Sequence, residues 1–175
     1  MSRVPDSEDI VAAFRLHYDA ILGYAFRMTG DRDEAEDVAS QAFLALAEQV
    51  RAGRFPPDVR PWLYRSTYNA VVSRSRRRQT RLNAVGDVWR WLTGTGGPPQ
   101  PTDRLQAASR QEAVRVALLR LSLEDRQVIV LRYDEEMDFA TIATVTGLTE
   151  GSVRSRLSRA LDRLRESLKE AGVDA

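Results

Sequence analysis

Apolar residues recur along most of this chain at steps of three and four, which is the spacing of one face of an α-helix. They predict a first helix over residues 10–29, ending near Gly30, and a second that follows at once, with Asp31 as its N-cap and Glu34 three residues later as in a capping box. A third helix is predicted from Pro61 into a run of arginines, because the first helical turn leaves the N–H that proline lacks unbonded in any case. The residues expected to be buried on the first two helices are Ile10, Phe14, Tyr18, Ile21 and Ala25, then Ala35, Ala39, Phe43, Leu46 and Val50.

The same periodicity returns in the C-terminal part of the sequence. It predicts helices over residues 106–120, 123–133, 138–146 and 149–169. The sequence has no sustained alternation of apolar and polar residues, so no strand is predicted and the fold class is all-α. We expect two small helical domains, at residues 7–80 and 106–170.

A segment rich in glycine and proline separates these two blocks. It reads Gly-Thr-Gly-Gly-Pro-Pro-Gln-Pro over residues 94–101, a composition that is typical of a flexible tether. We therefore place a linker at residues 81–105. Trp89 and Trp91 lie inside it, and the sequence leaves open whether they cover a flanking domain or contact a partner.

Residues 138–150 have the sequence pattern of a helix-turn-helix: a short helix, a glycine turn and a capping residue at the start of a second helix. Gly147 can adopt the left-handed conformation of the turn, and the Thr149 hydroxyl can cap the next helix. Arginine and serine occupy the polar face of its first turns, where a recognition helix contacts base edges. A solvated basic helix packed in a bundle would show the same pattern. The stripe expected to be buried on this last helix is Val153, Leu157, Leu161, Leu164 and Leu168.

Composition excludes several classes of function. With 175 residues, no cysteine and one histidine, the chain has one or two domains and offers no disulfide, no thiolate metal site and no histidine cluster. The sequence also contains no phosphate-binding glycine loop with a lysine and no evident pair of nucleophile and base, so we expect no enzyme, no cofactor and no metal. The acidic run 134–136 is more typical of a solvated helix end than of a metal site. No apolar stretch is long enough for a membrane span and no signal peptide is evident, so we expect a cytoplasmic protein without membrane insertion.

The net charge of +1 conceals a strong separation of charge along the chain. Residues 1–50 contain ten acids and four bases, whereas residues 59–81 contain seven arginines and no acid. Arginine makes up 25 of the 26 basic residues, which a GC-rich coding sequence would also explain. The separation indicates two surfaces of opposite sign.

Two separate blocks of the sequence resemble one protein family. Residues 121–133, followed by 142–143, 147–148 and 151–160, closely resemble region 4 of sigma-70 family factors of the extracytoplasmic function (ECF) type. Residues 29–38, followed by 43–44, 55, 62–65 and 69, resemble region 2 of the same family. The resemblance covers about residues 10–80 and 106–168.

This resemblance implies a promoter-specificity subunit with bacterial RNA polymerase core and promoter DNA as partners, and an anti-sigma factor as a further one. The residues that correspond to the family's core-binding positions are Asp33, Glu34, Glu36, Asp37, Gln41 and Phe43. Those implied to recognise and open the minus-ten element are Arg54, Arg60, Trp62, Tyr64, Arg65, Tyr68, Asn69, Arg74, Arg76 and Arg77. Those implied to read the minus-thirty-five element are Ser152, Arg154, Ser155, Arg156, Ser158 and Arg159.

Five positions depart from the family pattern, namely Ser40, Gln41, Ala47, Ser73 and Ser158. The first three lie on the predicted core-binding helix and motivate an alternative: a sigma-like adapter or decoy that binds polymerase or an anti-sigma factor without opening DNA. A dimeric helix-turn-helix repressor is a third hypothesis, and the region 2 resemblance argues against it.

Overall fold

The structure is a computed structural model of the chain. It describes residues 7–93, 110–170 and 172. For residues 7, 79–93 and 110 it describes only the backbone. The side chains of Trp89 and Trp91, and residues 94–105 of the predicted linker, therefore lie outside the described residues. Within the described ranges all regular structure is helical, which confirms the predicted fold class. The helices are α1 (Ser7–Thr29), α2 (Arg32–Arg51), α3 (Val59–Thr93), α4 (Arg110–Arg120), α5 (Leu123–Tyr133), α6 (Phe139–Thr146) and α7 (Glu150–Glu170).

The ends of the first two helices follow the predicted signals. Gly30 ends α1 with a φ of 76°, and the Asp31 carboxylate accepts a hydrogen bond from the Glu34 backbone N–H at 2.8 Å. Helix α3, in contrast, begins at Val59, two residues before Pro61, because the Asp58 carboxylate accepts the Arg60 N–H at 3.2 Å and so caps the helix earlier. The backbone of α3 remains helical to Thr93, so residues 81–93 of the predicted linker belong to this helix.

Helices α1, α2 and α3 form the N-terminal body, and α1 packs against both of the others. The predicted core residues Ala35, Ala39 and Leu46 are fully buried, but Phe14 is 43% exposed. Phe14 lies at the edge of the core, stacked on Tyr18 with 4.5 Å between ring centroids. It was therefore wrong to expect a buried Phe14.

Helix α1 also buries a second face that its main apolar stripe did not predict. Tyr24 and Met28 are 0% and 1% exposed, although neither belongs to the stripe that faces α2. The Tyr24 ring lies edge-on to Tyr64 of α3, at 5.0 Å between centroids, and beside Gln127 of α5, and the Met28 backbone carbonyl accepts from Arg126 of α5. This helix is therefore apolar on two sides because it lies between two groups of helices.

Helices α4 to α7 form the C-terminal body, and its helix-turn-helix agrees with the prediction. Gly147 has a φ of 73°, and the Thr149 hydroxyl oxygen accepts the Ser152 N–H at 3.2 Å at the start of α7. The predicted stripe of α7 packs inward, with Val153 and Leu157 buried against the rest of the body.

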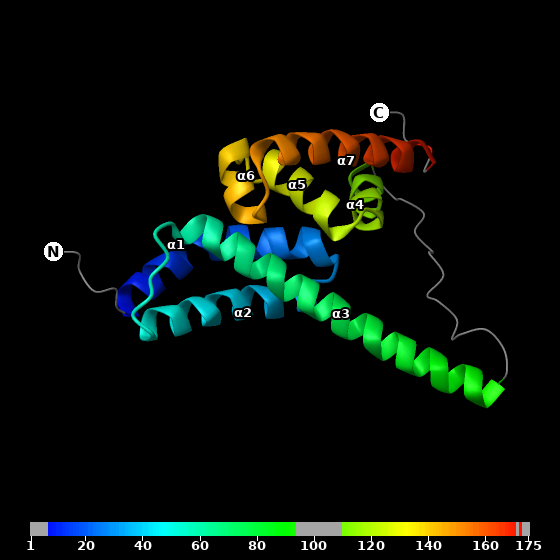
Figure 1. Cartoon of the computed structure of the whole chain (residues 1–175), viewed down its shortest axis with the longest axis horizontal. Coiled ribbons are helices and arrows are strands. Elements are labelled where there is room, and N and C mark those ends of the chain that lie inside the picture. Colours follow the sequence, from blue (N-terminus) through cyan, green and yellow to red (C-terminus); the bar gives the residue numbers. More distant parts are fainter. Residues whose placement is uncertain (1–6, 94–109, 171, 173–175) are drawn as a thin grey trace.

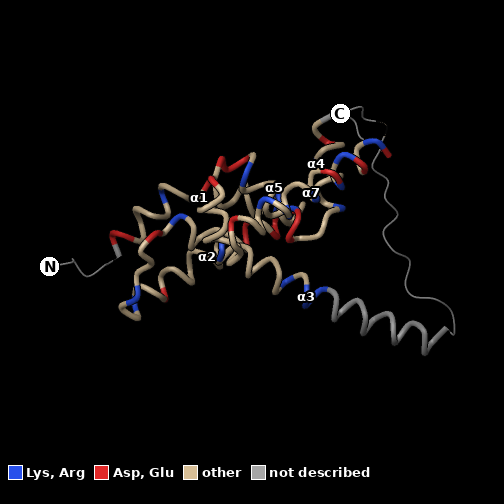
Figure 2. The backbone as a smooth tube through the Cα atoms, turned by 45° about the horizontal axis from the view of Figure 1, so that its top comes forward, with Lys and Arg blue, Asp and Glu red and all other residues tan. Residues whose placement is uncertain are grey.

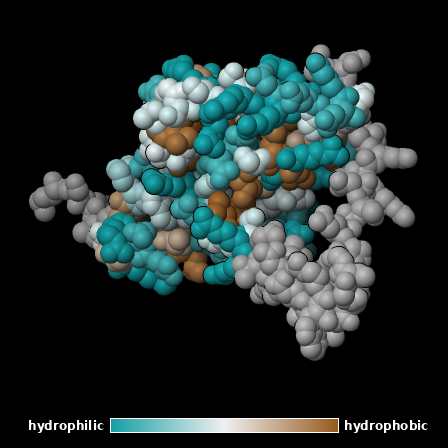
Figure 3. Space-filling model, turned by 45° about the vertical axis from the view of Figure 1, so that its right-hand side comes forward, coloured by the Kyte–Doolittle hydropathy of each residue, from teal (hydrophilic) through white to brown (hydrophobic). Residues whose placement is uncertain are grey.

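The two bodies pack directly against each other. In Figure 1, α4–α7 lie together on one side of α1 and of the first part of α3. The contact includes an ion pair of 2.7 Å between the Arg27 guanidinium and the Asp134 carboxylate. A single cluster of buried apolar residues extends through both bodies. Among the coloured residues in the view of Figure 3, hydrophilic ones predominate, and hydrophobic ones form patches between them. Across the described helices, none combines the length and apolar character that a bilayer crossing requires.

Arg126 joins the C-terminal ends of two helices at this contact. Its side chain is 6% exposed and donates to the carbonyl oxygens of Leu118 (2.9 Å), Leu119 (2.6 Å) and Leu121 (3.1 Å), and to that of Met28 across the junction. Burial lowers its pKa to about 10, so the guanidinium is charged at neutral pH. Carbonyl groups at helix C-termini carry partial negative charge and stabilise this cation.

Candidate functional site

Acidic side chains form an exposed face on the first turns of α2. Asp33, Glu36, Asp37 and Gln41 are exposed and Glu34 is half-buried. The positive end of the helix dipole favours carboxylates at this position, so the face is compatible with a stable helix. It has the character of a surface that binds a basic partner.

Phe43 does not belong to this acidic face. It is 6% exposed, and its ring meets Phe14 edge-on at 5.0 Å between centroids. Its position agrees with the predicted buried stripe of α2, and it exposes little surface.

Arginines of α3 face the acids of α2. The Arg74 guanidinium lies 3.0 Å from the Asp37 carboxylate. Figure 2 shows basic positions of α3 grouped just before the part of this helix that is drawn in grey. An open hollow of about 620 Å³ separates the two sets of charges, lined by Asp31, Asp33, Glu34, Asp37, Arg74, Arg77 and Arg78. The acidic face of α2 and the arginines of α3, which the sequence predicts to have separate roles, therefore lie side by side.

The remaining predicted minus-ten residues of α3 divide between two faces. Trp62, Arg65, Asn69 and Arg76 recur at steps of three, four and seven, so they share one helical face. Arg65, Asn69 and Arg76 are exposed and Trp62 is half-buried. Arg54 lies apart from both faces, on the loop after α2, where its Nε donates to Gln49 at 3.0 Å.

The second face, formed by Arg60, Tyr64 and Tyr68, lies at the junction of the two bodies. Tyr64 is 1% exposed, and its hydroxyl donates to the Glu135 carboxylate. The Arg60 guanidinium donates to the Glu135 backbone carbonyl at 2.9 Å. Burial, together with the hydrogen bond to Glu135, raises the pKa of Tyr64. In this arrangement Tyr64 cannot stack on a base.

Glu135 contacts two predicted minus-ten residues, Arg60 and Tyr64, and the sequence did not predict this contact. The run 134–136 was interpreted as a solvated helix end, but Glu135 is half-buried and binds residues that lie far away in the sequence. Helical periodicity relates residues three or four positions apart, so it gives no signal for such a contact.

Most of the predicted minus-thirty-five residues share one exposed face of α7. Ser152, Arg154, Ser155, Ser158 and Arg159 are all exposed. Local hydrogen bonds orient part of this face, since the Ser155 hydroxyl donates to the Gly151 carbonyl at 3.0 Å and the Arg159 Nε donates to the Ser155 carbonyl at 3.3 Å.

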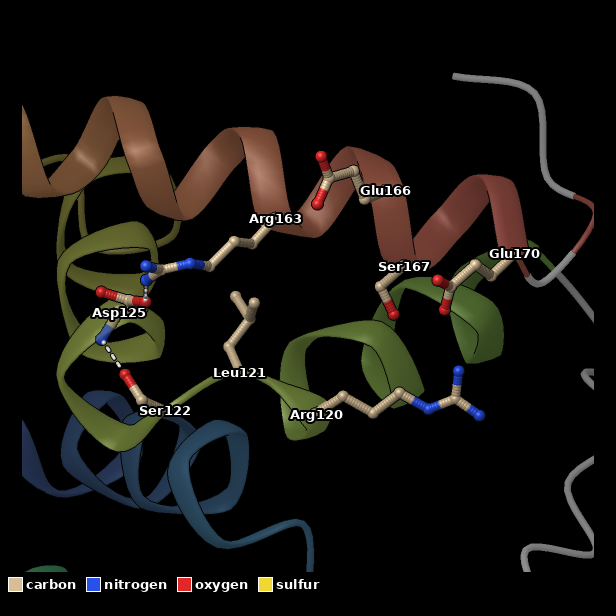
Figure 4. Close-up of a pocket in the computed structure, with 8 residues that line it drawn as sticks. All are labelled: Arg120, Leu121, Ser122, Asp125, Arg163, Glu166, Ser167 and Glu170. Carbon is tan, nitrogen blue, oxygen red and sulfur yellow. Dashed lines mark hydrogen bonds and ion pairs between the residues drawn. The ribbon is translucent and has the colours of Figure 1, made fainter.

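Arg156 is the exception, because its guanidinium points back toward α5. It is half-buried and its Nη1 lies 4.0 Å from the carboxylate of Asp125, which is 4% exposed. Figure 4 shows Arg163 reaching the same carboxylate from α7, while the Ser122 hydroxyl accepts the Asp125 N–H at 3.2 Å. A hollow of about 410 Å³ beside this ion pair is lined by side chains of α4, α5 and α7. Asp125 thus joins α5 to α7 through Arg163, and the Arg156 guanidinium lies beside this ion pair.

The described residues offer no group of three or more histidine, aspartate or glutamate side chains arranged to hold a metal ion. The described surface presents carboxylates on α2 and guanidinium and hydroxyl groups on α3 and α7, which are groups that can recognise charge.

Comparison with known proteins agrees with this architecture. Residues 13–81 match the family model "Sigma-70 region 2", and residues 111–164 match "Sigma-70, region 4". The ECF RNA polymerase sigma factor SigL of Mycobacterium tuberculosis is 35% identical to this chain over 93% of its length and 90% of SigL. The ECF sigma factor SigW of Bacillus subtilis is 26% identical, over 93% of this chain and 88% of SigW.

A solved structure shows the same fold. The sigma factor RpoE of Bartonella quintana, in complex with the anti-sigma factor NepR, superposes with a TM-score of 0.71 at 23% identity, over 93% of this chain and 98% of that one. With region 2 and region 4 both matched in order and a relative above 30% identity along nearly the whole chain, this protein belongs to the ECF group of the sigma-70 family of RNA polymerase sigma factors.

Proposed function

We propose that this protein binds the core of bacterial RNA polymerase in the cytoplasm and directs it to promoters by recognising minus-ten and minus-thirty-five elements. Residues 7–80 would form the unit for core binding and the minus-ten element, and residues 106–170 the unit for the minus-thirty-five element. The observation that carries the proposal is the presence, in one sigma-family chain, of an exposed acidic face on α2 and an exposed arginine and serine face on α7.

Core binding is assigned to Asp33, Glu36, Asp37 and Gln41. A carboxylate surface gains affinity from a complementary basic partner and loses it when its charge is reversed. We expect the double substitution Glu36→Lys and Asp37→Lys to weaken retention of purified core enzyme by the tagged protein. Glu166→Lys, at an exposed position of α7, is the matched control and retains core. Equal retention by both variants would remove the α2 face from the proposal.

Minus-ten recognition is assigned to the face of α3 formed by Trp62, Arg65, Asn69 and Arg76. Unpaired bases stack on aromatic rings, and cationic side chains bind the phosphates of the strand. Trp62→Ala and Arg65→Ala should lower promoter opening by the holoenzyme, measured by permanganate reactivity of unpaired thymines. Unaltered reactivity with both variants would contradict this assignment.

Minus-thirty-five recognition is assigned to Arg154, Ser155, Ser158 and Arg159. Arginine can bridge guanine O6 and N7, and loss of such a contact costs about 1–3 kcal/mol at a specific site. We expect Arg154→Ala and Arg159→Ala to lower affinity for the cognate promoter by that amount, whereas Arg156→Ala should act mainly on stability. If both of the first two variants bind the promoter normally, α7 is not the recognition helix.

The alternative of a sigma-like adapter or decoy is favoured by one observation, the burial of Tyr64 beneath Glu135. A run-off transcription assay with core enzyme separates the two functions, because a decoy yields no specific transcript. We include an anti-sigma factor among the proposed partners, by analogy with the RpoE complex.

A further inference from the structure

Two guanidinium groups that come from different helices lie over the ring of Phe139. Cζ of Arg154, on α7, lies 4.0 Å from the centroid of the Phe139 ring, and Cζ of Arg132, on α5, lies 4.9 Å from it. A cation over the face of an aromatic ring is attracted by the electron density of that face. The ring therefore orders two arginines at the helix-turn-helix.

The ring itself is held in place. Phe139 is the first residue of α6, and the preceding Asp138 caps this helix by accepting the Thr141 N–H at 2.7 Å. The half-buried ring also packs against the core of the C-terminal body. The Arg132 guanidinium is anchored by a hydrogen bond of 2.8 Å to the Met137 carbonyl.

Arg154 is also restrained from its own helix. Its Nη2 lies 3.4 Å from the Glu150 carboxylate, one turn earlier on α7. Ring and carboxylate together restrict a side chain that is exposed and would otherwise sample many rotamers.

We propose that Phe139 is a positioning residue for Arg154 in promoter recognition: it holds the Arg154 guanidinium in the orientation in which α7 presents it to duplex DNA. The inference rests on the proposed function, in which Arg154 reads the minus-thirty-five element. A side chain that is ordered before binding loses less conformational entropy when it binds. Phe139 acts through Arg154 and makes no base contact of its own.

The experiment measures the affinity of holoenzyme for a promoter selected with the wild-type protein from a randomised library. Removing the ring in Phe139→Leu should lower affinity by about two- to five-fold, the range that an exposed cation–π contact supports. Phe139→Tyr keeps a ring face and should bind like the wild type. Phe14→Leu, which replaces an exposed aromatic residue on α1, is the matched control and should leave affinity unchanged.

A double-mutant cycle separates positioning from direct contact or general packing. In the Arg154→Ala background, Phe139→Leu should cause no further loss, because the guanidinium assigned to the promoter is absent and Arg132, which the ring also contacts, has no assigned DNA contact. A full additional loss in that background overturns the proposal. If Arg154→Ala alone leaves affinity unchanged, the assigned role of Arg154 fails and the positioning role fails with it. If Arg154→Ala weakens binding but Phe139→Leu does not, only the positioning role fails.

A second readout keeps the test decisive even if Phe139→Leu does not fold. In the free wild-type protein and in Phe139→Tyr, the ring current should shift the Arg154 side-chain NMR resonances upfield, with Arg154→Ala used to assign them. Unshifted Arg154 resonances in the wild type would overturn the proposal.

Discussion

Substitution of Gly30 by alanine tests the contact between the two bodies. Gly30 has a φ of +76°, and a Cβ added there would lie 2.7 Å from Cδ1 and 2.9 Å from Cδ2 of Leu119 on α4. Gly53 offers a matched control, since its φ is +70° and a Cβ added there would meet no atom within 4 Å. The two sites therefore share a backbone conformation and differ in their neighbours.

The expected magnitude follows from this comparison. An alanine in the left-handed conformation costs roughly 1–2 kcal/mol, offset in part by about 0.4–1 kcal/mol from the loss of freedom in the unfolded chain. Both terms apply equally to Gly30 and Gly53, so they cancel in the difference. Overpacking against Leu119 adds about 1–2 kcal/mol at Gly30 alone, in the lower part of the usual range because the leucine methyl groups can rotate away.

The assay is urea unfolding followed by circular dichroism. Gly30→Ala should lower the free energy of unfolding by about 1–2 kcal/mol more than Gly53→Ala does. In a Leu119→Ala background this excess should disappear, because the colliding side chain is gone. Equal destabilisation by the two glycine variants, or an excess that persists without Leu119, would refute the packing of α4 against the end of α1.

Three further predictions concern buried and capping groups. Arg126→Met leaves carbonyl groups unpaired at the junction, which costs about 1–3 kcal/mol for each buried group. It should therefore lower the free energy of unfolding far more than Arg165→Met, which changes an exposed position. Similar losses in the two variants would contradict the role of Arg126. Burial raises the pKa of Tyr24 and Tyr64 above their ordinary value, so the folded state keeps protons that the unfolded state releases and the free energy of unfolding should fall as the pH rises above about 10. Phenolate absorbance from these two tyrosines should then appear only with unfolding, and ionisation in a native protein would argue against their burial. The hydrogen bonds from Thr141 lower the pKa of Asp138, so its contribution to stability is complete above its ordinary pKa and lost as the pH falls through its folded value; Asp138→Asn should reduce this acid sensitivity in pH-dependent unfolding, and an unchanged acid profile would contradict the cap.

Much of the fold could be predicted because its signals are local. Asp31, Gly147 and Thr149 act where their chemistry suggested, since a cap or a left-handed turn involves residues only two to four positions apart. The extra length of α3 and the second buried face of α1 could not be predicted in this way. Tyr24 is buried because α1 lies between two groups of helices, and the spacing along α1 does not reveal how many neighbours it has.

The candidate site was predictable to a similar extent. The exposed positions on α7 follow from the helical stripe that buries Val153 and Leu157, which leaves Arg154 and Arg159 outside it. The inward orientation of Arg156 depends on a carboxylate from another helix, and the burial of Tyr64 depends on Glu135. Charged and aromatic residues with long-range partners resemble surface residues in a sequence, so their roles require the tertiary structure.

We propose that this chain gives polymerase its choice of promoter. The most direct measurement is transcription of a random promoter library by purified bacterial core enzyme, with and without the protein, followed by sequencing of the transcript 5′ ends. We predict a set of start sites that appears only with the protein and shares two upstream sequence elements at a fixed spacing. A pattern of start sites that is identical with and without the protein would contradict the claim.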